Sequence, residues 1–203
     1  ENICVDLKAA VTYVDDRESV LQGRVGIGDS VSAQYIYDTS VVDNNSLAAV
    51  ADYWHYASPN GVTLNVGGLT FRTNPNYVNF LIEILDNHTG LDAYLFRSYN
   101  NEVTGITLPP ADDESLHISW QLVDGGQTAV TSVELPTTPP DISKFGSYGL
   151  SVDYDAYGDH FSRFRIRSEV TSAELCVTDE DGDGVEDDVD ACPVSETSEG
   201  VIV

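Results

Sequence analysis

The chain has 203 residues, and its 34 acidic side chains against 9 basic ones give a formal net charge of −25. Clustered lysine and arginine side chains bind nucleic acids and anionic membranes, so this balance argues against both partners. Apolar residues make up 41% of the chain, which is enough for a buried core. No apolar stretch approaches the roughly 18 residues of a membrane-spanning helix. We therefore expect no membrane insertion, and partners that are cations, neutral glycans or other proteins.

Short blocks of alternating apolar and polar residues, rich in β-branched and aromatic side chains, recur along the chain. In chain order these blocks cover residues 9–14, 30–38, 61–71, 77–85, 91–99, 116–124, 148–155 and 161–170. Pairs that favour turns, such as Asn60-Gly61 and Gly125-Gly126, separate them. The pattern predicts an all-β fold, namely a two-sheet antiparallel sandwich with a jelly roll as the favoured strand order.

Several blocks carry more detailed expectations. In residues 30–38 the alternation puts four side chains on one face, which predicts a half-buried strand; they are Val31, Ala33, Tyr35 and Tyr37. The apolar run over 80–85 predicts a central strand that is covered on both faces. The pair Gly67-Gly68 predicts a bulge or a close approach of the sheet. Residues 44–54 are expected to hold one or two helical turns.

The three cysteines are Cys4, Cys176 and Cys192. Cys4 and Cys176 lie in similar apolar contexts near the two ends of the large domain. Because the first and last strands of a sandwich are often neighbours, we expect a disulfide between these two. The alternatives are a Cys176–Cys192 bridge and three unpaired thiols. A disulfide implies an oxidising compartment, and a chain beginning at Glu1 without methionine is consistent with a cleaved signal peptide, so secretion is expected.

The composition changes near Val177, where aromatic residues give way to Asp, Glu, Gly and Ser. We therefore expect a β-domain over residues 1–177 and a short C-terminal unit over 178–203. In the run "DEDGDGVEDDVDACP" (179–193), oxygen ligands at alternate positions would let a short loop wrap a hard cation, and Gly184 would permit the sharp turn. The expected Ca²⁺ ligands are Asp179, Asp181, Asp183, the backbone carbonyl of Val185, Asp187 and Asp190. A solvated acidic tail is the alternative.

This acidic run resembles a thrombospondin type 3 repeat, whose pattern is D-x-D-x-D-G-x-x-D-x-x-D-x-C-P. Every fixed position matches, through Cys192 and Pro193. The resemblance implies calcium bound by an extracellular protein, although the family usually carries tandem repeats and this chain has one. The remainder of the chain resembles uncharacterised secreted bacterial β-domains in "VGIGDSVSAQYIYDTS", "VTLNVGGLTF" and "LPTTPPDISKF", which implies no activity.

Candidate binding residues lie in the segment "DYWHY" (52–56). Aromatic faces stack on sugar rings, so Tyr53, Trp54 and Tyr56 are candidate glycan contacts, and a loop that covers the core is the alternative. Asn44 and Asn87 each begin an Asn-x-Ser/Thr sequence and are candidate glycosylation sites. Three more acidic residues would suit a second calcium ion or an ordinary polar loop; they are Asp153, Asp155 and Asp159.

Catalytic motifs are missing from the sequence. The four histidines have no metal-ligand spacing from one another or from a cysteine, and there is no G-x-S-x-G elbow and no P-loop. Carboxylate pairs such as Glu83 and Asp86 are expected by chance in so acidic a chain. We therefore expect that the protein is not an enzyme.

The favoured function is that of a secreted, calcium-stabilised structural protein, the subunit of an extracellular or cell-surface fibre. The expected joint is a homopolymer contact through the terminal strands, "ENICVDL" (1–7) and the tail "SEGVIV" (198–203), because unpaired strands accept a second chain. Alternatively, either segment pairs within its own domain. The other candidate function is a carbohydrate-binding module or lectin-like adhesin, with polysaccharide as the partner.

Overall fold

The computed structural model describes residues 1–109, 115–155 and 162–176. Every strand in these ranges belongs to one antiparallel sheet, which confirms the all-β prediction. The strands are β1 (Asn2–Asp16), β2 (Ser30–Asp38), β3 (Val50–His55), β4 (Gly61–Val66), β5 (Leu69–Thr73), β6 (Asn79–His88), β7 (Leu91–Tyr99), β8 (Asn101–Thr104), β9 (Ser115–Asp124), β10 (Ser147–Asp155) and β11 (Ser162–Leu175). The described helix content is a single 3₁₀ turn, η1 (Ile142–Lys144), and no helix in these ranges has the length and apolar character needed to cross a bilayer.

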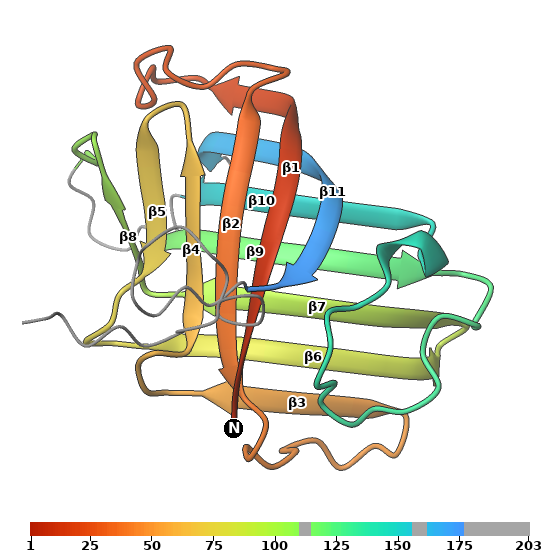
Figure 1. Ribbon diagram of the computed structural model, residues 1–203. Coiled ribbons are helices and arrows are strands. Elements are labelled where there is room, and N and C mark those ends of the chain that lie inside the picture. Colours follow the sequence, from red (N-terminus) through yellow and green to blue (C-terminus); the bar gives the residue numbers. More distant parts are fainter. Residues whose placement is uncertain (110–114, 156–161, 177–203) are drawn as a thin grey trace, which may run out of the picture.

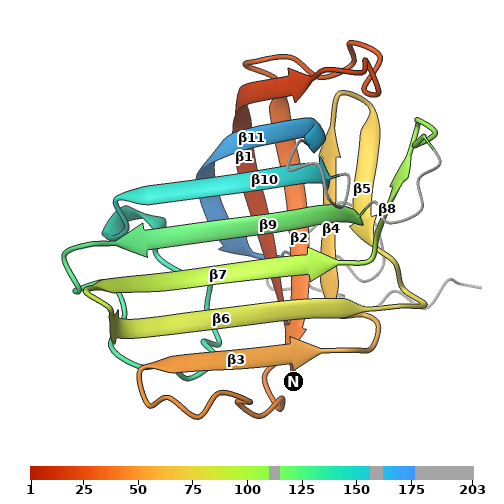
Figure 2. The same cartoon turned by 180° about the vertical axis from the view of Figure 1, so that it is seen from behind.

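The sheet has the strand order β3-β6-β7-β9-β10-β11-β1-β2-β4-β5-β8 and curls over itself. Strands β3, β6, β7, β9 and β10 form one layer, which we call the five-strand layer (Figures 1 and 2). Strands β1, β2, β4 and β5 cross in front of it in Figure 1, and β11 curves from one layer to the other. Core side chains fill the space between the layers; for example, the ring of Tyr35 on β2 lies 5.0 Å from that of Phe96 on β7.

Continuity at the bend is what distinguishes this sheet from the predicted pair of sheets. β11 pairs with β10 on one side and with β1 on the other, so hydrogen bonding runs without a break from one layer into the next. The β1–β11 ladder shifts register between Lys8 and Ala9 and again between Val11 and Tyr13. Such irregularities bend a strand and increase its twist, which lets one sheet supply both layers. Neither two separate sheets nor the jelly-roll order is confirmed.

Strand β2 shows how the sequence determines which face is buried. Its buried residues alternate along the strand and are the four predicted ones, Val31, Ala33, Tyr35 and Tyr37. Successive side chains of a strand point to opposite faces, so a single register puts all four into the core. Burial of a large apolar side chain contributes about 1.5–3 kcal/mol, and the opposite register would lose all four together.

Two local expectations are revised by the structure. Gly67 and Gly68 do not form a bulge inside one strand; with φ values of 58° and 72° they make the two-residue turn between β4 and β5. The expected close approach is present, because a Cβ on Gly67 would collide with the backbone of Arg24. Residues 47–49 form a turn rather than the expected helix, and the segment that follows is strand β3.

The two ends of the described chain meet in the middle of the sheet. β1 lies between β2 and β11, and a disulfide joins Cys4 to Cys176 across a Cα–Cα distance of 5.3 Å. This agrees with the expected pairing of Cys4 with Cys176. Residues 2–10 also pair along β2, so the N-terminal segment adopts the alternative in which it pairs within its own domain.

A long connection, residues 125–146, covers the core at one end of the five-strand layer (Figure 1). Side chains from the sheet hold its backbone. The hydroxyl of Tyr37 donates to the carbonyl of Pro136 at 2.7 Å, and that of Tyr53 donates to the carbonyl of Val133 at 2.9 Å. The buried carboxylate of Asp92 accepts from the amide of Val130 at 2.9 Å. The connection is therefore tied to the core by polar contacts as well as by packing.

Candidate functional site

The aromatic segment 52–56 is divided between the two faces of the sheet by strand alternation. Tyr53 points into the core, where it is buried and bonded to Val133, so it is unavailable to a ligand. Trp54 points to the opposite, outer face of the five-strand layer and is half-buried, and Tyr56 just beyond β3 is 69% exposed. Two of the three candidate glycan contacts, Trp54 and Tyr56, are therefore accessible from outside.

These two rings begin a row of aromatic side chains that crosses the strands. The ring centroids of Trp54 and Tyr56 are 6.2 Å apart with an interplanar angle of 4°, and those of Trp54 and Tyr99 on β7 are 6.0 Å apart at 25°. Tyr99 in turn lies 5.3 Å from His117 on β9, nearly perpendicular to it. We call these four residues, Tyr56, Trp54, Tyr99 and His117, the aromatic row.

Polar groups lie beside the aromatic row on the same face. Cross-strand register aligns Trp54 with Leu81, Arg97, Ser119 and Ser151, one residue from each successive strand. Leu81 is 4% exposed although it lies on the outer side, because its neighbours cover it. Leu81 and Leu95 are buried on this side by neighbouring side chains. No described segment covers this face of β6, which lies next to the edge strand β3 (Figure 2), so the prediction of a central strand covered on both faces is not confirmed.

The next line of residues on this face supplies further hydrogen-bonding groups. It runs through Asp52, Glu83, Leu95, Gln121 and Gly149. Glu83 forms an ion pair with Arg97 at 3.0 Å, so these two side chains hold each other in place across β6 and β7. An ion pair that is partly exposed adds little stability, and here it keeps the two charges next to each other.

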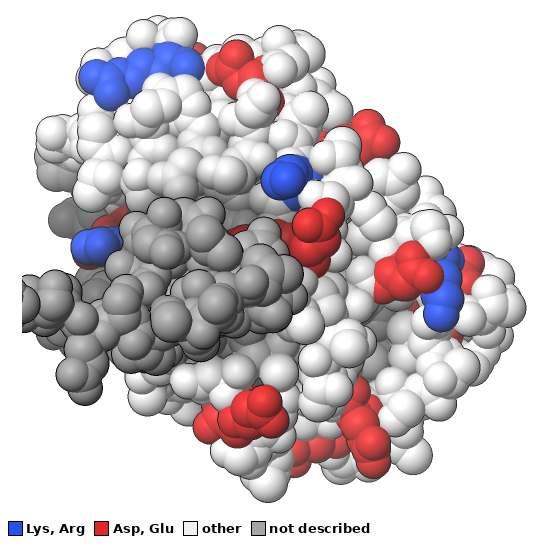
Figure 3. Space-filling view, in the orientation of Figure 1, with Lys and Arg blue, Asp and Glu red and all other residues white. Residues whose placement is uncertain are grey.

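No described segment runs in front of β6, β7 and β9 when the five-strand layer is viewed from outside (Figure 2). The described part of the opposite side of the molecule has only isolated lysine and arginine groups and no continuous basic patch (Figure 3). With the net charge of −25, this leaves the aromatic row as the most distinctive surface among the described residues.

Tyr99 and His117 are members of the aromatic row that sequence analysis did not identify. Each belongs to a predicted strand, and each is the outward residue at its position. Their meeting with Trp54 depends on β3 lying beside β6 and on β9 lying beside β7, pairs of strands that do not follow one another along the chain. Strand alternation could have placed both on an outer face, but it could not bring them together.

The expected calcium ligands, Asp179 to Asp190, lie outside the described residues, as do Cys192 and Asp159. Within residues 1–109, 115–155 and 162–176, no group of three or more His, Cys, Asp or Glu side chains could hold a metal ion. Asp153 is instead paired with Arg165. The two candidate glycosylation sites, Asn44 and Asn87, are both exposed.

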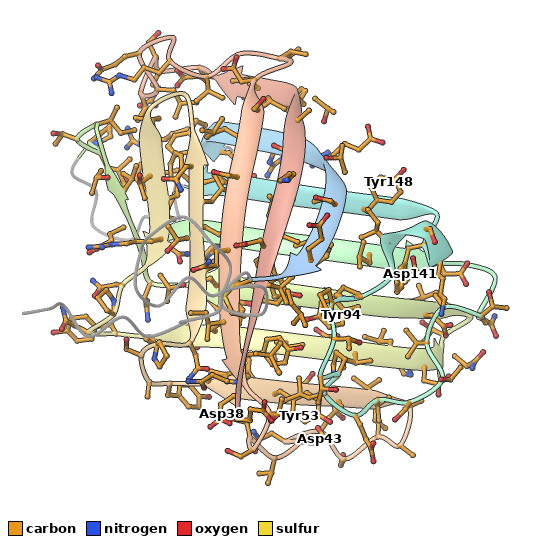
Figure 4. All side chains as sticks on the ribbon, in the orientation of Figure 1. Asp38, Asp43, Tyr53, Tyr94, Asp141 and Tyr148 are labelled. Atoms are coloured by element: carbon orange, nitrogen blue, oxygen red, sulfur yellow. A yellow bond between two sulfur atoms is a disulfide. The ribbon has the colours of Figure 1, made fainter. Side chains whose placement is uncertain are left out.

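A cavity lies between the 125–146 connection and the core. This cavity of about 600 Å³ has Ile84, Tyr94 and Phe145 among its apolar lining, and Asp141 and Lys144 among its polar lining. Figure 4 shows Tyr53, Tyr94 and Asp141 around this connection. Burial raises the pKa of Tyr94 and Tyr35 well above the ordinary value, so both hydroxyls stay protonated; they lie 3.2 Å apart. Both rings are packed in the core.

Comparison with known proteins gives no match: no family model, no curated protein and no solved structure is significantly similar to the chain. The functional argument therefore rests on the residues themselves.

Proposed function

We propose that this protein binds polysaccharide through the outer face of its five-strand layer. The observation that carries the proposal is the aromatic row, in which Trp54, Tyr56 and Tyr99 lie nearly parallel and centroid-to-centroid about 6 Å apart on an accessible sheet face. Aromatic rings offer apolar surface to the C–H groups of sugars. Glu83, Arg97 and Gln121 beside them offer hydrogen-bond partners to sugar hydroxyls.

The side chains of the row are preorganised, which means that contacts within the protein restrain them before a ligand binds. Contacts between neighbouring rings are worth about 0.5–1.5 kcal/mol beyond area burial, and the Glu83–Arg97 pair restrains the adjoining side chains. Little side-chain entropy then remains to be lost on binding. A flat and open face also suits a polymer better than a small molecule, which requires a concave pocket.

The proposed role is binding rather than catalysis. Of the carboxylates considered for glycoside hydrolysis, Glu83 is paired with Arg97 and Asp153 with Arg165. A glycosidase of the common kind uses two carboxyl groups that flank the scissile bond, and these two are each engaged by an arginine.

The test is affinity electrophoresis of the whole protein through gels that contain soluble polysaccharides. We expect retardation in at least one gel, and loss of retardation in Trp54→Ala. Tyr13→Ala is the matched control, because Tyr13 is also an exposed aromatic residue but lies on β1. Migration that no polysaccharide slows, or equal retardation of Trp54→Ala and wild type, would contradict the proposal.

The proposed setting is extracellular. It is supported by the disulfide between Cys4 and Cys176, since such bridges persist in oxidising compartments, and by the resemblance of residues 179–193 to a secreted calcium-binding repeat. We further propose that this loop binds Ca²⁺ through the six residues named above.

Assembly into fibres remains a second proposal, which now depends on the C-terminal tail as the donor segment. Residues 2–10 pair along β2 and are not an open edge. β3, by contrast, ends the sheet, and exposed Val42 and Leu47 lie in the segment that leads into it. A sheet edge flanked by apolar residues suits the addition of a strand from another copy. Electron microscopy of the intact chain and of a chain lacking 199–203 tests this, and fibres from both would refute the tail as the joint.

A further inference from the structure

We infer that the ligand of the aromatic row is an uncharged, extended polysaccharide that crosses the strands and is bound along its length rather than at an end. This inference rests on the proposed function. It adds the chemical class of the glycan and the direction in which it lies. Three features of the outer face carry it: the direction of the row, the pairing of Arg97 and Arg165 with carboxylates beside it, and the small residues next to it.

The direction of the row comes from strand register. Its members lie on β3, β7 and β9, with β6 between β3 and β7, so the row runs across the strands rather than along one of them. Neighbouring strands are about 4.8 Å apart, and the distance from β3 to β9 is therefore roughly 14 Å. Such a row matches several successive sugar rings of an extended chain, whereas a tightly coiled glycan would touch one or two rings.

The charges on this face favour an uncharged ligand. Arg97 is paired with Glu83 and Arg165 with Asp153, and exposed Arg167, which follows Ser151 in the register on β11, lies over the ring of Tyr13. Asp52 adds a further negative charge on the same face, next to Glu83 in the register. A uronate or sulfate group on the row would meet these carboxylates, and the net charge of −25 would oppose its approach.

The residues beside the row on β9 and β10 include several with short side chains or none. Ser119 and Ser151 follow Arg97 in one line of the register, and Gly149 follows Gln121 in the next. A chain lying against Tyr99 and His117 therefore has short side chains beside it on β9 and β10, and it meets Asp153 directly beyond His117. The short side chains of Ser119, Ser151 and Gly149 leave this side of the row open as far as Arg167 and Glu169 on β11, which favours contacts within a polymer over recognition of its terminus.

The test compares three groups of soluble polysaccharides in affinity gels and by calorimetry. The groups are uncharged extended chains (hydroxyethyl cellulose, galactomannan, xyloglucan), uncharged coiled chains (dextran, pullulan) and anionic chains (alginate, polygalacturonate). We expect the whole protein to bind the first group, with an affinity that changes little when salt is added or when the chain ends are chemically reduced. Trp54→Ala and Tyr99→Ala should each weaken this binding about tenfold or more, and Tyr13→Ala should not weaken it.

The outcomes separate this inference from the proposed function. Binding only to anionic or coiled chains that is lost in Trp54→Ala would overturn the inference and leave the proposed function intact. Loss of binding on reduction of chain ends would overturn the claim that the glycan is bound along its length. Absence of binding to all three groups would overturn both proposals.

Unchanged binding of extended chains by Trp54→Ala and Tyr99→Ala would place the site elsewhere. Thermal unfolding of each variant identifies any variant that fails to fold. Trp54→Phe or Tyr99→Phe then takes the place of that alanine variant. Because these variants retain a ring, we expect them to lose less affinity.

Discussion

The Nε2 atom of His55 on β3 lies 3.2 Å from the carbonyl oxygen of Asp38, at the end of β2. The other ring nitrogen, Nδ1, lies 3.1 Å from the carbonyl oxygen of Tyr53. A neutral imidazole carries one N–H and can donate to only one of these two acceptors. His55 therefore joins the edge of the five-strand layer to the crossing layer, in a place where its protonation state matters.

We predict that this histidine makes the fold less stable in mild acid. An imidazole in the unfolded chain takes up a proton near pH 6.5, whereas burial lowers the pKa of His55 in the folded chain. Below that pH the unfolded state binds more protons, so the free energy of unfolding falls as pH decreases from 7 towards 5. Urea unfolding across this range should show the fall, and His55→Gln should reduce its slope. An identical slope in the variant would contradict the assignment.

The loss of stability that protonation of Asp38 causes falls in a different, more acidic pH range. Hydrogen bonds from Ser40 and the N-terminal amine lower the pKa of this carboxyl to about 2. Its contribution is complete above the unfolded value of about 4 and is lost as pH falls through about 2. The two groups can therefore be separated by pH alone.

The second prediction concerns the disulfide. The bridge between Cys4 and Cys176 closes a loop with a sequence separation of 172. In the chain-entropy description, opening so long a loop costs about 5 kcal/mol, mainly because the unfolded chain gains freedom. We expect Cys4→Ser to lower the free energy of unfolding by an amount of this order and to increase the denaturant m-value. Equal midpoints for wild type and variant in urea would contradict this.

The third prediction uses the two glycines of the β4–β5 turn. Gly67 and Gly68 have similar positive φ values, but a Cβ on Gly67 would collide with the backbone of Arg24, whereas a Cβ on Gly68 meets nothing within 4 Å. Gly68→Ala should cost about 1–2 kcal/mol for the left-handed conformation alone. Gly67→Ala should cost several kcal/mol, because the backbone must also move. Thermal unfolding measures both, and equal losses would show that the approach to Arg24 is unimportant.

The fourth prediction tests the proposed calcium loop. Calcium should raise the melting temperature of the intact protein, and a chelator should reverse the change, since a ligand that binds only the folded state stabilises it. Asp181→Ala should weaken binding more than Glu180→Ala, because loop position 3 supplies a ligand and position 2 points outward. Calorimetry that gives no heat of binding, together with melting that calcium does not change, would rule the loop out.

Sequence patterns located most strands because alternation and turn residues are local properties. β2 and β7 have the predicted bounds, 30–38 and 91–99. Residues 44–54 were expected to hold one or two helical turns, but β3 begins within this segment at Val50. β8 has only four residues, which is too short for an alternation of apolar and polar residues to be recognised. Strand order was not predictable from these patterns, because it depends on contacts between segments far apart in the chain. For the same reason Trp54 could be proposed as a glycan contact, but its neighbour Tyr99 could not.

The central position of β11 has a consequence for how the protein is made. The ribosome releases β11 last among the described strands, yet it lies between β10 and β1 and links the two layers. A nascent chain that lacks residues 162–175 would have two unfinished layers with open edges, so stable folding must wait until synthesis of the sheet is complete. A factor that acts on the unfinished chain would therefore meet it without its stable fold.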